Sequence, residues 1–346
     1  MGGGDPRVKI MRTLIVSAGV LLLAAGAAPA QVLVNGAGAT FPYPIYAKWF
    51  DEFHKLDPNA QINYQSIGSG GGIRQLLAGT VDFGATDSPM TNEQMSKASS
   101  QILHFPTVLG AVVATYNVPG LKQELNFTPD ALAGIFLGTI GKWNDRELNK
   151  ANPGVALPAS DIVVVHRSDG SGTTFVWTDY LSKVSAAWKS NVGSGTSVRW
   201  PVGLGAKGNE GVAGLVKQTP NAIGYVELVY ALQNKMPYGR VRNAGGSLIR
   251  PELKSVTAAA ADASANMPDD FRVSITNPPG KDAYPISSFT WLLVPQKIQD
   301  AQKRKILVDF LRWMLQDGQK LAEPLGYAPL PKSVAAKELK AVPQIQ

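Results

Sequence analysis

Four short turns contain most of the residues that could bind a small ligand. Each turn is rich in glycine, serine or threonine and lies between an expected strand and an expected helix. Glycine lets the backbone approach a ligand closely, the N–H groups at a helix N-terminus attract anions, and hydroxyls add donors. The four turns are residues 36–41, 68–72, 85–88 and 167–174. A single glycine-rich turn is usually only a tight turn, but four in corresponding positions predict an oxyanion pocket that excludes water.

Arg167 is the only formal positive charge in these turns. A guanidinium group binds phosphate-type oxygens through two parallel hydrogen bonds. Asp169, two residues further along, could hold the guanidinium in place. The sequence leaves open a second interpretation, in which Arg167 belongs to an ordinary ion pair at the surface.

Asp87 is unexpected in such a pocket, because an unpaired carboxylate repels an anion. Its presence makes sense if the ligand carries a proton that the carboxylate can accept. Phosphate keeps a proton near neutral pH, since phosphate monoesters have a second pKa of about 6, whereas sulfate does not. Asp87 would then favour phosphate over sulfate. In the alternative interpretation, which is compatible with the first, Asp87 caps the N-terminus of the next helix.

The same turns match no catalytic motif. Residues 169–174 resemble a P-loop, but no lysine follows the glycine. Ser69 and Ser171 are not in a nucleophile elbow, because Ile67 and Asp169 occupy the position of its leading glycine. The sequence therefore favours binding without catalysis.

Metal sites and cofactors are not expected either. The chain has no cysteine, and its three histidines, His54, His104 and His166, are far apart in the sequence. No calcium loop or H-E-x-x-H helix occurs. Lysine and arginine are scattered and do not alternate with aromatic residues, so we expect no nucleic-acid partner.

Short runs of β-type residues alternate with helical patterns, which indicates an α/β fold. A length of 346 residues exceeds what one core usually holds and favours two domains. Two long apolar β runs, 107–116 and 285–294, are candidate crossings between these domains. The helices expected elsewhere cover residues 42–56, 73–78, 175–184, 248–265 and 297–325, and the tail from residue 328 is expected to wrap the surface.

The first thirty residues have the three parts of a secretory signal peptide. A basic start precedes an uncharged run at 14–28, which ends in the small-residue signal 28–30. The run has 15 residues, too few to span a bilayer, although an uncleaved anchor helix is the alternative. We expect export and cleavage after Ala30, which would change the net charge from +7 to +5. Met11 is a second candidate start.

Seven stretches of the chain resemble the periplasmic phosphate-binding proteins of the phosphate-specific ABC transporter, the PstS family. They are GAGATFPYPIYAKW (36–49), YQSIGSGGGIRQ (64–75), VDFGATDSP (81–89), FPTVLG (105–110), RSDGSGTTFVWTDYL (167–181), WPVGLGAKGNEGVA (200–213) and AIGYVE (222–227). The resemblance covers essentially the whole mature chain and weakens within about 240–280 and at the tail.

The resemblance implies a set of phosphate ligands at positions where this chain agrees with the family. These residues are Thr40, Phe41, Ser69, Asp87, Arg167, Ser171, Gly172 and Thr173, with Asp169 as the partner of Arg167. Phe41 would act through its backbone N–H. Gly70 stands where relatives have a second serine, which places one peripheral contact in doubt.

The resemblance also implies a two-domain, type II periplasmic binding protein fold, with a hinge of two crossing strands and a ligand cleft between the domains. Domain I would combine residues 31–107 with 285–346, and domain II would be 108–284. The protein would be a periplasmic monomer that delivers inorganic phosphate to the permease subunits of an ABC importer. Two other functions stay open: a secreted phosphatase-like enzyme on the same scaffold, and an adhesion protein with a vestigial pocket.

Overall fold

The computed structural model describes residues 1–2 and 31–346. The predicted signal peptide and its cleavage after Ala30 therefore lie outside the described residues. The part considered below is the compact unit Val32–Gln346. Within the described residues, no helix combines the length and the apolar character needed to cross a membrane.

An eight-stranded mixed sheet forms the centre of this unit. Its spatial order is β2 (Ala60–Ser66), β1 (Val32–Gly38), β3 (Phe83–Thr86), β11 (Ser287–Pro295), β4 (Ile102–Asn117), β8 (Ala222–Glu227), β6 (Val163–Arg167) and β7 (Leu204–Ala206). We call β2, β1 and β3 the first half of the sheet, and β8, β6 and β7 the second half. Strands within each half run parallel to one another.

The long strand β4 connects the two halves. Residues 102–111 of β4 pair with β11, and residues 112–117 pair with β8, both antiparallel. The ladder with β11 is irregular at one point, where Thr290 faces Val108 but Trp291 faces Pro106. Thr107 is therefore a bulged residue without an opposite partner, next to a proline that has no N–H to donate.

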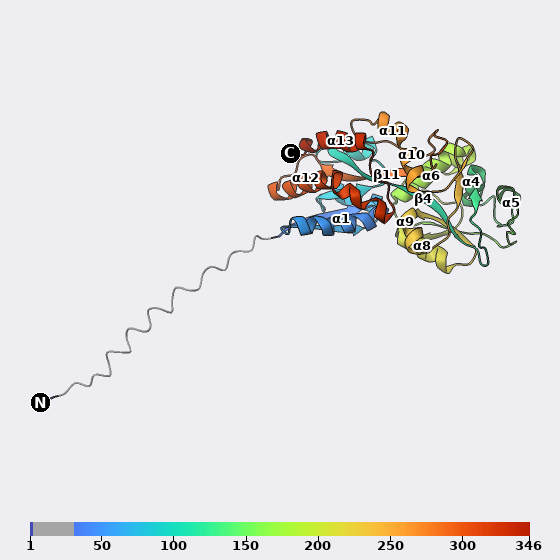
Figure 1. Ribbon diagram of the computed structural model, residues 1–346, viewed down its shortest axis with the longest axis horizontal. Coiled ribbons are helices and arrows are strands. Elements are labelled where there is room, and N and C mark those ends of the chain that lie inside the picture. Colours follow the sequence, from blue (N-terminus) through green and yellow to red (C-terminus); the bar gives the residue numbers. More distant parts are fainter. Residues whose placement is uncertain (3–30) are drawn as a thin grey trace. The chain divides into compact units, whose positions relative to one another are not determined.

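Helices pack on both halves of the sheet (Figure 1). They are α1 (Tyr43–Leu56), α2 (Ser69–Leu77), α3 (Asn92–Ser96), α4 (Pro129–Leu137), α5 (Arg146–Ala151), α6 (Gly172–Val184), α7 (Ala186–Asn191), α8 (Gly208–Gln218), α9 (Leu228–Gln233), α10 (Leu253–Ala259), α11 (Ala261–Ala265), α12 (Ala301–Leu315) and α13 (Lys332–Ala341). Figure 1 shows α1, α12 and α13 at one end of the unit, and α4, α5 and α8 at the other. A small second sheet has the order β10 (Leu248–Ile249), β9 (Arg240–Arg242) and β5 (Asn126–Phe127).

Helix α1 illustrates how the sequence forms these elements. Pro44 lies in the first turn, where its missing N–H leaves no intrahelical bond unmade. Tyr46, Trp49, Phe50 and Phe53 recur at helical spacing, and all four are buried. Burial of each such side chain stabilises the fold by about 1.5–3 kcal/mol.

Three segments differ from the expectations. Helix α2 begins at Ser69, four residues before the predicted start, so the expected glycine-rich turn is the first turn of the helix. The segment 248–265, predicted as one helix, begins instead with strand β10, which pairs with β9, and α10 follows it. The tail contains the regular helix α13.

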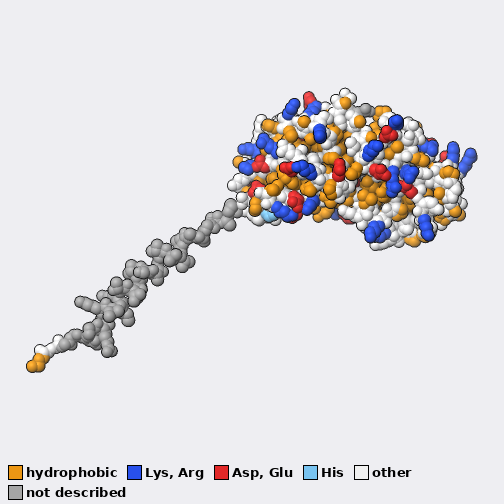
Figure 2. Space-filling view, in the orientation of Figure 1, with side chains coloured by type: hydrophobic (Ala, Val, Ile, Leu, Met, Phe, Trp, Pro, Cys, Tyr) orange, Lys and Arg blue, Asp and Glu red, His pale blue; other side chains and the backbone are white. Residues whose placement is uncertain are grey.

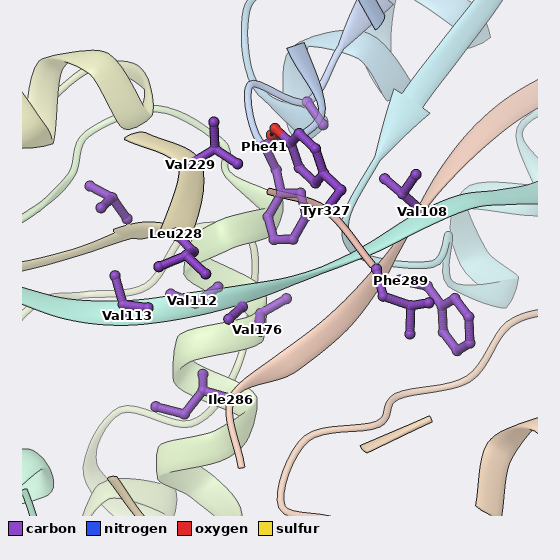
Figure 3. Packing of buried hydrophobic residues seen from close by; sticks show 14 of the residues in the cluster. Phe41, Val108, Val112, Val113, Val176, Leu228, Val229, Ile286, Phe289 and Tyr327 are labelled. Atoms are coloured by element: carbon purple, nitrogen blue, oxygen red, sulfur yellow. Dashed lines mark hydrogen bonds between the residues drawn. The ribbon is translucent and has the colours of Figure 1, made fainter. Parts of the chain in front are cut away.

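One hydrophobic core extends along β4 and includes residues from both halves of the sheet. Figure 3 shows Val108, Val112 and Val113 spaced along this strand, with Phe289 on the neighbouring β11. The ring of Phe41 packs against the backbone of β4 at Gly110, where an added Cβ would come within 2.6 Å of a ring carbon. The core thereby fixes the turn that follows β1.

Candidate functional site

The predicted turns meet where the two halves of the sheet adjoin. Strands β1, β2 and β3 are parallel, so the turns that follow them leave the same edge of the first half. The turn after β6 approaches from the second half, and the Gly70 N–H donates to the Gly170 carbonyl at 2.8 Å. Gly68 has φ +88°, and an added Cβ there would lie 2.6 Å from that same carbonyl oxygen, so only glycine fits.

Arg167 ends β6 and points into this junction. Its Nε and Nη2 atoms donate to the two carboxylate oxygens of Asp169 at 2.7 and 2.5 Å, a bidentate pair. The Arg167 side chain is 1% exposed and that of Asp169 is 11% exposed, which excludes the interpretation as a surface ion pair. Burial alone would raise the pKa of Asp169, but the hydrogen bonds and charge of Arg167 hold it below its usual range.

Ser69 joins the two halves through its hydroxyl oxygen. This oxygen accepts the N–H of Gly172 at 3.0 Å, from the second half, and the N–H of Asp87 at 3.2 Å, from the first. An added Cβ at Gly172 would lie 2.4 Å from the Ser69 oxygen and 2.5 Å from Asp87 Oδ2. Glycine is therefore required at the first residue of α6.

Asp87 is buried beside Ser69, and its Oδ1 accepts a hydrogen bond from Thr290 at 2.8 Å. Burial raises the pKa of Asp87 to about 7, although the Thr290 hydrogen bond and the charge of Arg167 oppose this rise. The capping interpretation of Asp87 is wrong. Thr91 caps α3 instead, with Gln94 completing a capping box.

Thr40 and Thr173 approach each other across the junction through Asn209. The Asn209 amide nitrogen donates to the Thr40 hydroxyl oxygen at 2.7 Å and to that of Thr173 at 3.1 Å. Arg167 Nη1 lies 3.4 Å from the Thr173 oxygen. All of these side chains are buried.

Ser171 and Phe41 complete the predicted set. Ser171 is the N-cap of α6, and its hydroxyl oxygen accepts the Thr174 N–H at 3.0 Å. The Phe41 carbonyl accepts a hydrogen bond from Tyr327 at 2.7 Å, and the two side chains lie side by side in Figure 3. Thus the eight predicted ligands and Asp169 lie in one connected region of hydrogen bonds and packed side chains.

Sequence reasoning missed several residues of this region, of which Asn209 and Thr290 bond to the side chains of proposed ligands. Asn209 lies at the start of α8 in a glycine-containing turn of the same kind as the four selected turns, so a signal was present. Thr290 lies on an apolar β run that gave no such signal. One described cavity, of about 520 Å³, borders this region, since its lining includes Tyr230, whose hydroxyl donates to the Thr40 carbonyl oxygen. Another, of about 300 Å³, lies outside the region and is lined by residues that include His104, Asp270 and Arg272.

Charged side chains are distributed differently on the surface and in this buried region. On the face shown in Figure 2, lysine and arginine side chains are interspersed with aspartate and glutamate. Arg167, by contrast, is buried and is not one of these exposed charges.

Comparison with known proteins identifies close relatives. A family model described as a PBP superfamily domain matches residues 24–318. The phosphate-binding protein PstS of Xylella fastidiosa strain Temecula1 is 48% identical over 312 residues, covering 90% of this chain and 85% of that protein. The phosphate-binding protein PstS of Pasteurella multocida is 46% identical over 305 residues, covering 88% of each chain.

Solved structures show the same fold at lower identity. The phosphate-binding protein from Stenotrophomonas maltophilia has a TM-score of 0.68 and 18% identity, covering 90% of this chain and 94% of that one. A phosphate-bound, high-affinity periplasmic phosphate-binding protein, PfluDING, has a TM-score of 0.70 and 22% identity, covering 89% and 93%. The predicted type II periplasmic binding protein fold is confirmed.

Proposed function

The chain belongs to the PstS family of phosphate-binding proteins, and from this premise we propose that it captures inorganic phosphate and delivers it to an ABC importer. One observation carries the proposal. The buried Arg167–Asp169 pair lies beside the Thr173 hydroxyl at the start of α6, where a helix N-terminus and a guanidinium converge. This combination suits a dehydrated phosphate anion.

The proposed ligands come from both halves of the sheet. Thr40, Phe41, Ser69 and Asp87 would contribute from the first half, and Arg167, Ser171, Gly172 and Thr173 from the second. Asp169 would orient the guanidinium without contacting phosphate. Hydroxyl and N–H donors would replace the hydration shell of the anion, since a buried charge is tolerated only when it is paired and hydrogen-bonded.

Asp87 would select for a protonated ligand. Thr290 occupies its Oδ1, and its Oδ2 faces Ser69 and the backbone of Gly172. Hydrogen phosphate can donate its proton to Oδ2, whereas sulfate has no proton and would be repelled.

We further propose that domain I comprises residues 31–107 and 285–346, domain II residues 108–284, and that β4 and β11 form the hinge. The change of partner along β4 from β11 to β8 supports this division. Closure of the domains would enclose phosphate, and the closed protein would dock on the permease as a periplasmic monomer, after cleavage at Ala30. The protein would not be an enzyme.

A calorimetric titration of the purified mature protein tests the function directly. We expect micromolar or tighter binding of phosphate and poor competition by sulfate. Absence of phosphate binding would contradict the proposal. Sustained hydrolysis of a chromogenic phosphate ester by the pure protein would instead support the phosphatase-like alternative.

A further inference from the structure

Asn209 is a buried amide that contacts both halves of the proposed phosphate site. It lies in the first turn of α8 and is 0% exposed. Its Nδ2 donates to Thr40, which follows β1, and to Thr173, which lies in α6 after β6. One amide group therefore contacts a proposed ligand from each half of the sheet.

The orientation of this amide is determined by its other end. Asn209 Oδ1 accepts the backbone N–H of Glu227 at 2.9 Å. A flipped amide would place its NH₂ group against that N–H donor and its oxygen against the two threonine hydroxyls. The donating NH₂ group must therefore face Thr40 and Thr173.

Both threonine oxygens accept two N–H groups in this arrangement. The Thr40 oxygen accepts Asn209 Nδ2 at 2.7 Å and the Asn209 backbone N–H at 3.3 Å. The Thr173 oxygen accepts Asn209 Nδ2 at 3.1 Å and Arg167 Nη1 at 3.4 Å. A hydroxyl has two lone pairs and one proton, so these bonds use both lone pairs and leave only the proton for a ligand.

We infer that Asn209 is a positioning residue for ligand selection: it commits the Thr40 and Thr173 hydroxyls to donate to the bound anion. A ligand oxygen that contacts either threonine must then be an unprotonated acceptor. The proton of hydrogen phosphate is consequently directed to Asp87, the carboxylate on the same side of the site as Thr40. This inference rests on the proposed function, because it assigns roles within the same phosphate site.

Asn209→Leu tests the inference, since leucine has a similar size but no donor. We expect phosphate affinity to fall at least about 30-fold, as removal of a buried donor leaves partners unpaired. Asn209→Asp is a second variant that keeps an acceptor for the Glu227 N–H but presents carboxylate to the threonines. It should lose affinity at least as strongly. Asn152→Leu is the matched control, because Asn152 is a buried asparagine whose amide donates to Asn126 and Leu148, outside the site.

A double-mutant cycle separates positioning from a general effect on folding. In a Thr40→Val, Thr173→Val background, Asn209→Leu should cause less than about a threefold further loss of phosphate affinity, because it acts through those hydroxyls. Full additivity of the losses would overturn the inference. The inference would also be overturned if the wild-type protein binds phosphate and a folded Asn209 variant binds it with nearly the same affinity. Failure of the wild-type protein to bind phosphate would refute the proposed function itself, and the inference with it.

Discussion

The two aspartates of the site lie on opposite halves of the sheet, and their pKa values shift in opposite directions. Burial raises the pKa of both. At Asp169 two hydrogen bonds from Arg167 outweigh burial, and the pKa falls below its usual range. At Asp87 the hydroxyl of Thr290 and the charge of Arg167 are too weak to do so, and the pKa rises to about 7. The buried guanidinium of Arg167 thus neutralises one carboxylate and leaves the other available to receive a ligand proton.

Of the substitutions considered, removal of Arg167 should have the largest effect on phosphate affinity, because it removes the group that makes the two aspartates differ. Arg167→Ala should lower phosphate affinity about a thousandfold (about 4 kcal/mol), since it deletes the cation and leaves Asp169 buried and unpaired. Calorimetry with phosphate measures the loss. Arg167→Lys should be intermediate, because lysine keeps the charge but lacks the bidentate geometry.

Arg240→Ala is the matched control for Arg167→Ala. Arg240 pairs with Glu124 at 2.9 Å, but its side chain is 46% exposed, and such pairs contribute about 0–1 kcal/mol. Phosphate affinity should be unchanged in this variant. A comparable loss in both variants would contradict a specific role for Arg167.

Asp87→Asn should change how the stability of the ligand-free protein depends on pH. The folded-state pKa of Asp87, about 7, exceeds the ordinary value of 3.8, so the folded protein retains a proton that the unfolded chain releases. The contribution of Asp87 to stability therefore decreases as pH rises from about 4 to about 7 and is constant above. Asp87→Asn should be more stable than wild type by about 2–4 kcal/mol at pH 8. Thermal unfolding of both proteins from pH 4 to pH 8 measures this difference, and a difference that is constant with pH would contradict the assignment.

The same substitution should have a smaller effect on ligand choice. In Asp87→Asn the ratio of phosphate to sulfate affinity should fall about tenfold, because an amide can donate to sulfate where a carboxylate repels it. Competitive calorimetry at pH 8 gives the ratio. Asp82→Asn, which alters a carboxylate paired with Lys303 at 3.0 Å, should leave the ratio unchanged. An unchanged ratio in Asp87→Asn would remove its proposed role.

Much of the architecture could be predicted from local patterns. The aromatic face of α1, the turn after β6 and the long β runs at β4 and β11 carry strong periodic or apolar signals. The sequence predicts a shorter helix from residue 73, because the glycines at 70–72 favour a turn over a helix. In the structure Gly72 packs so closely on β1 that an added Cβ would lie 2.4 Å from the Ala37 carbonyl oxygen. Tertiary packing overrides local propensity there.

The site could be predicted only where its residues lie in turns. Thr290 lies between the apolar residues Phe289 and Trp291, and it meets Asp87 through a contact that spans 203 positions. Strands of two or three residues, such as β5, β9 and β10, are too short to show an alternating pattern. Such features depend on which strands become neighbours, and local periodicity carries no information about that.

The bulge at Thr107 makes chain length, more than composition, the property that β4 must keep. Thr290 and Trp291 face opposite sides of the sheet, so their partners Val108 and Pro106 also do, although they are two residues apart. A regular ladder that kept Thr107 would instead reverse the facing of residues 102–106, and His104, whose Nε2 accepts the Met90 N–H at 3.1 Å, would turn away from the segment that follows Asp87. Substitutions along β4 should therefore be tolerated far better than single-residue insertions or deletions away from the bulge.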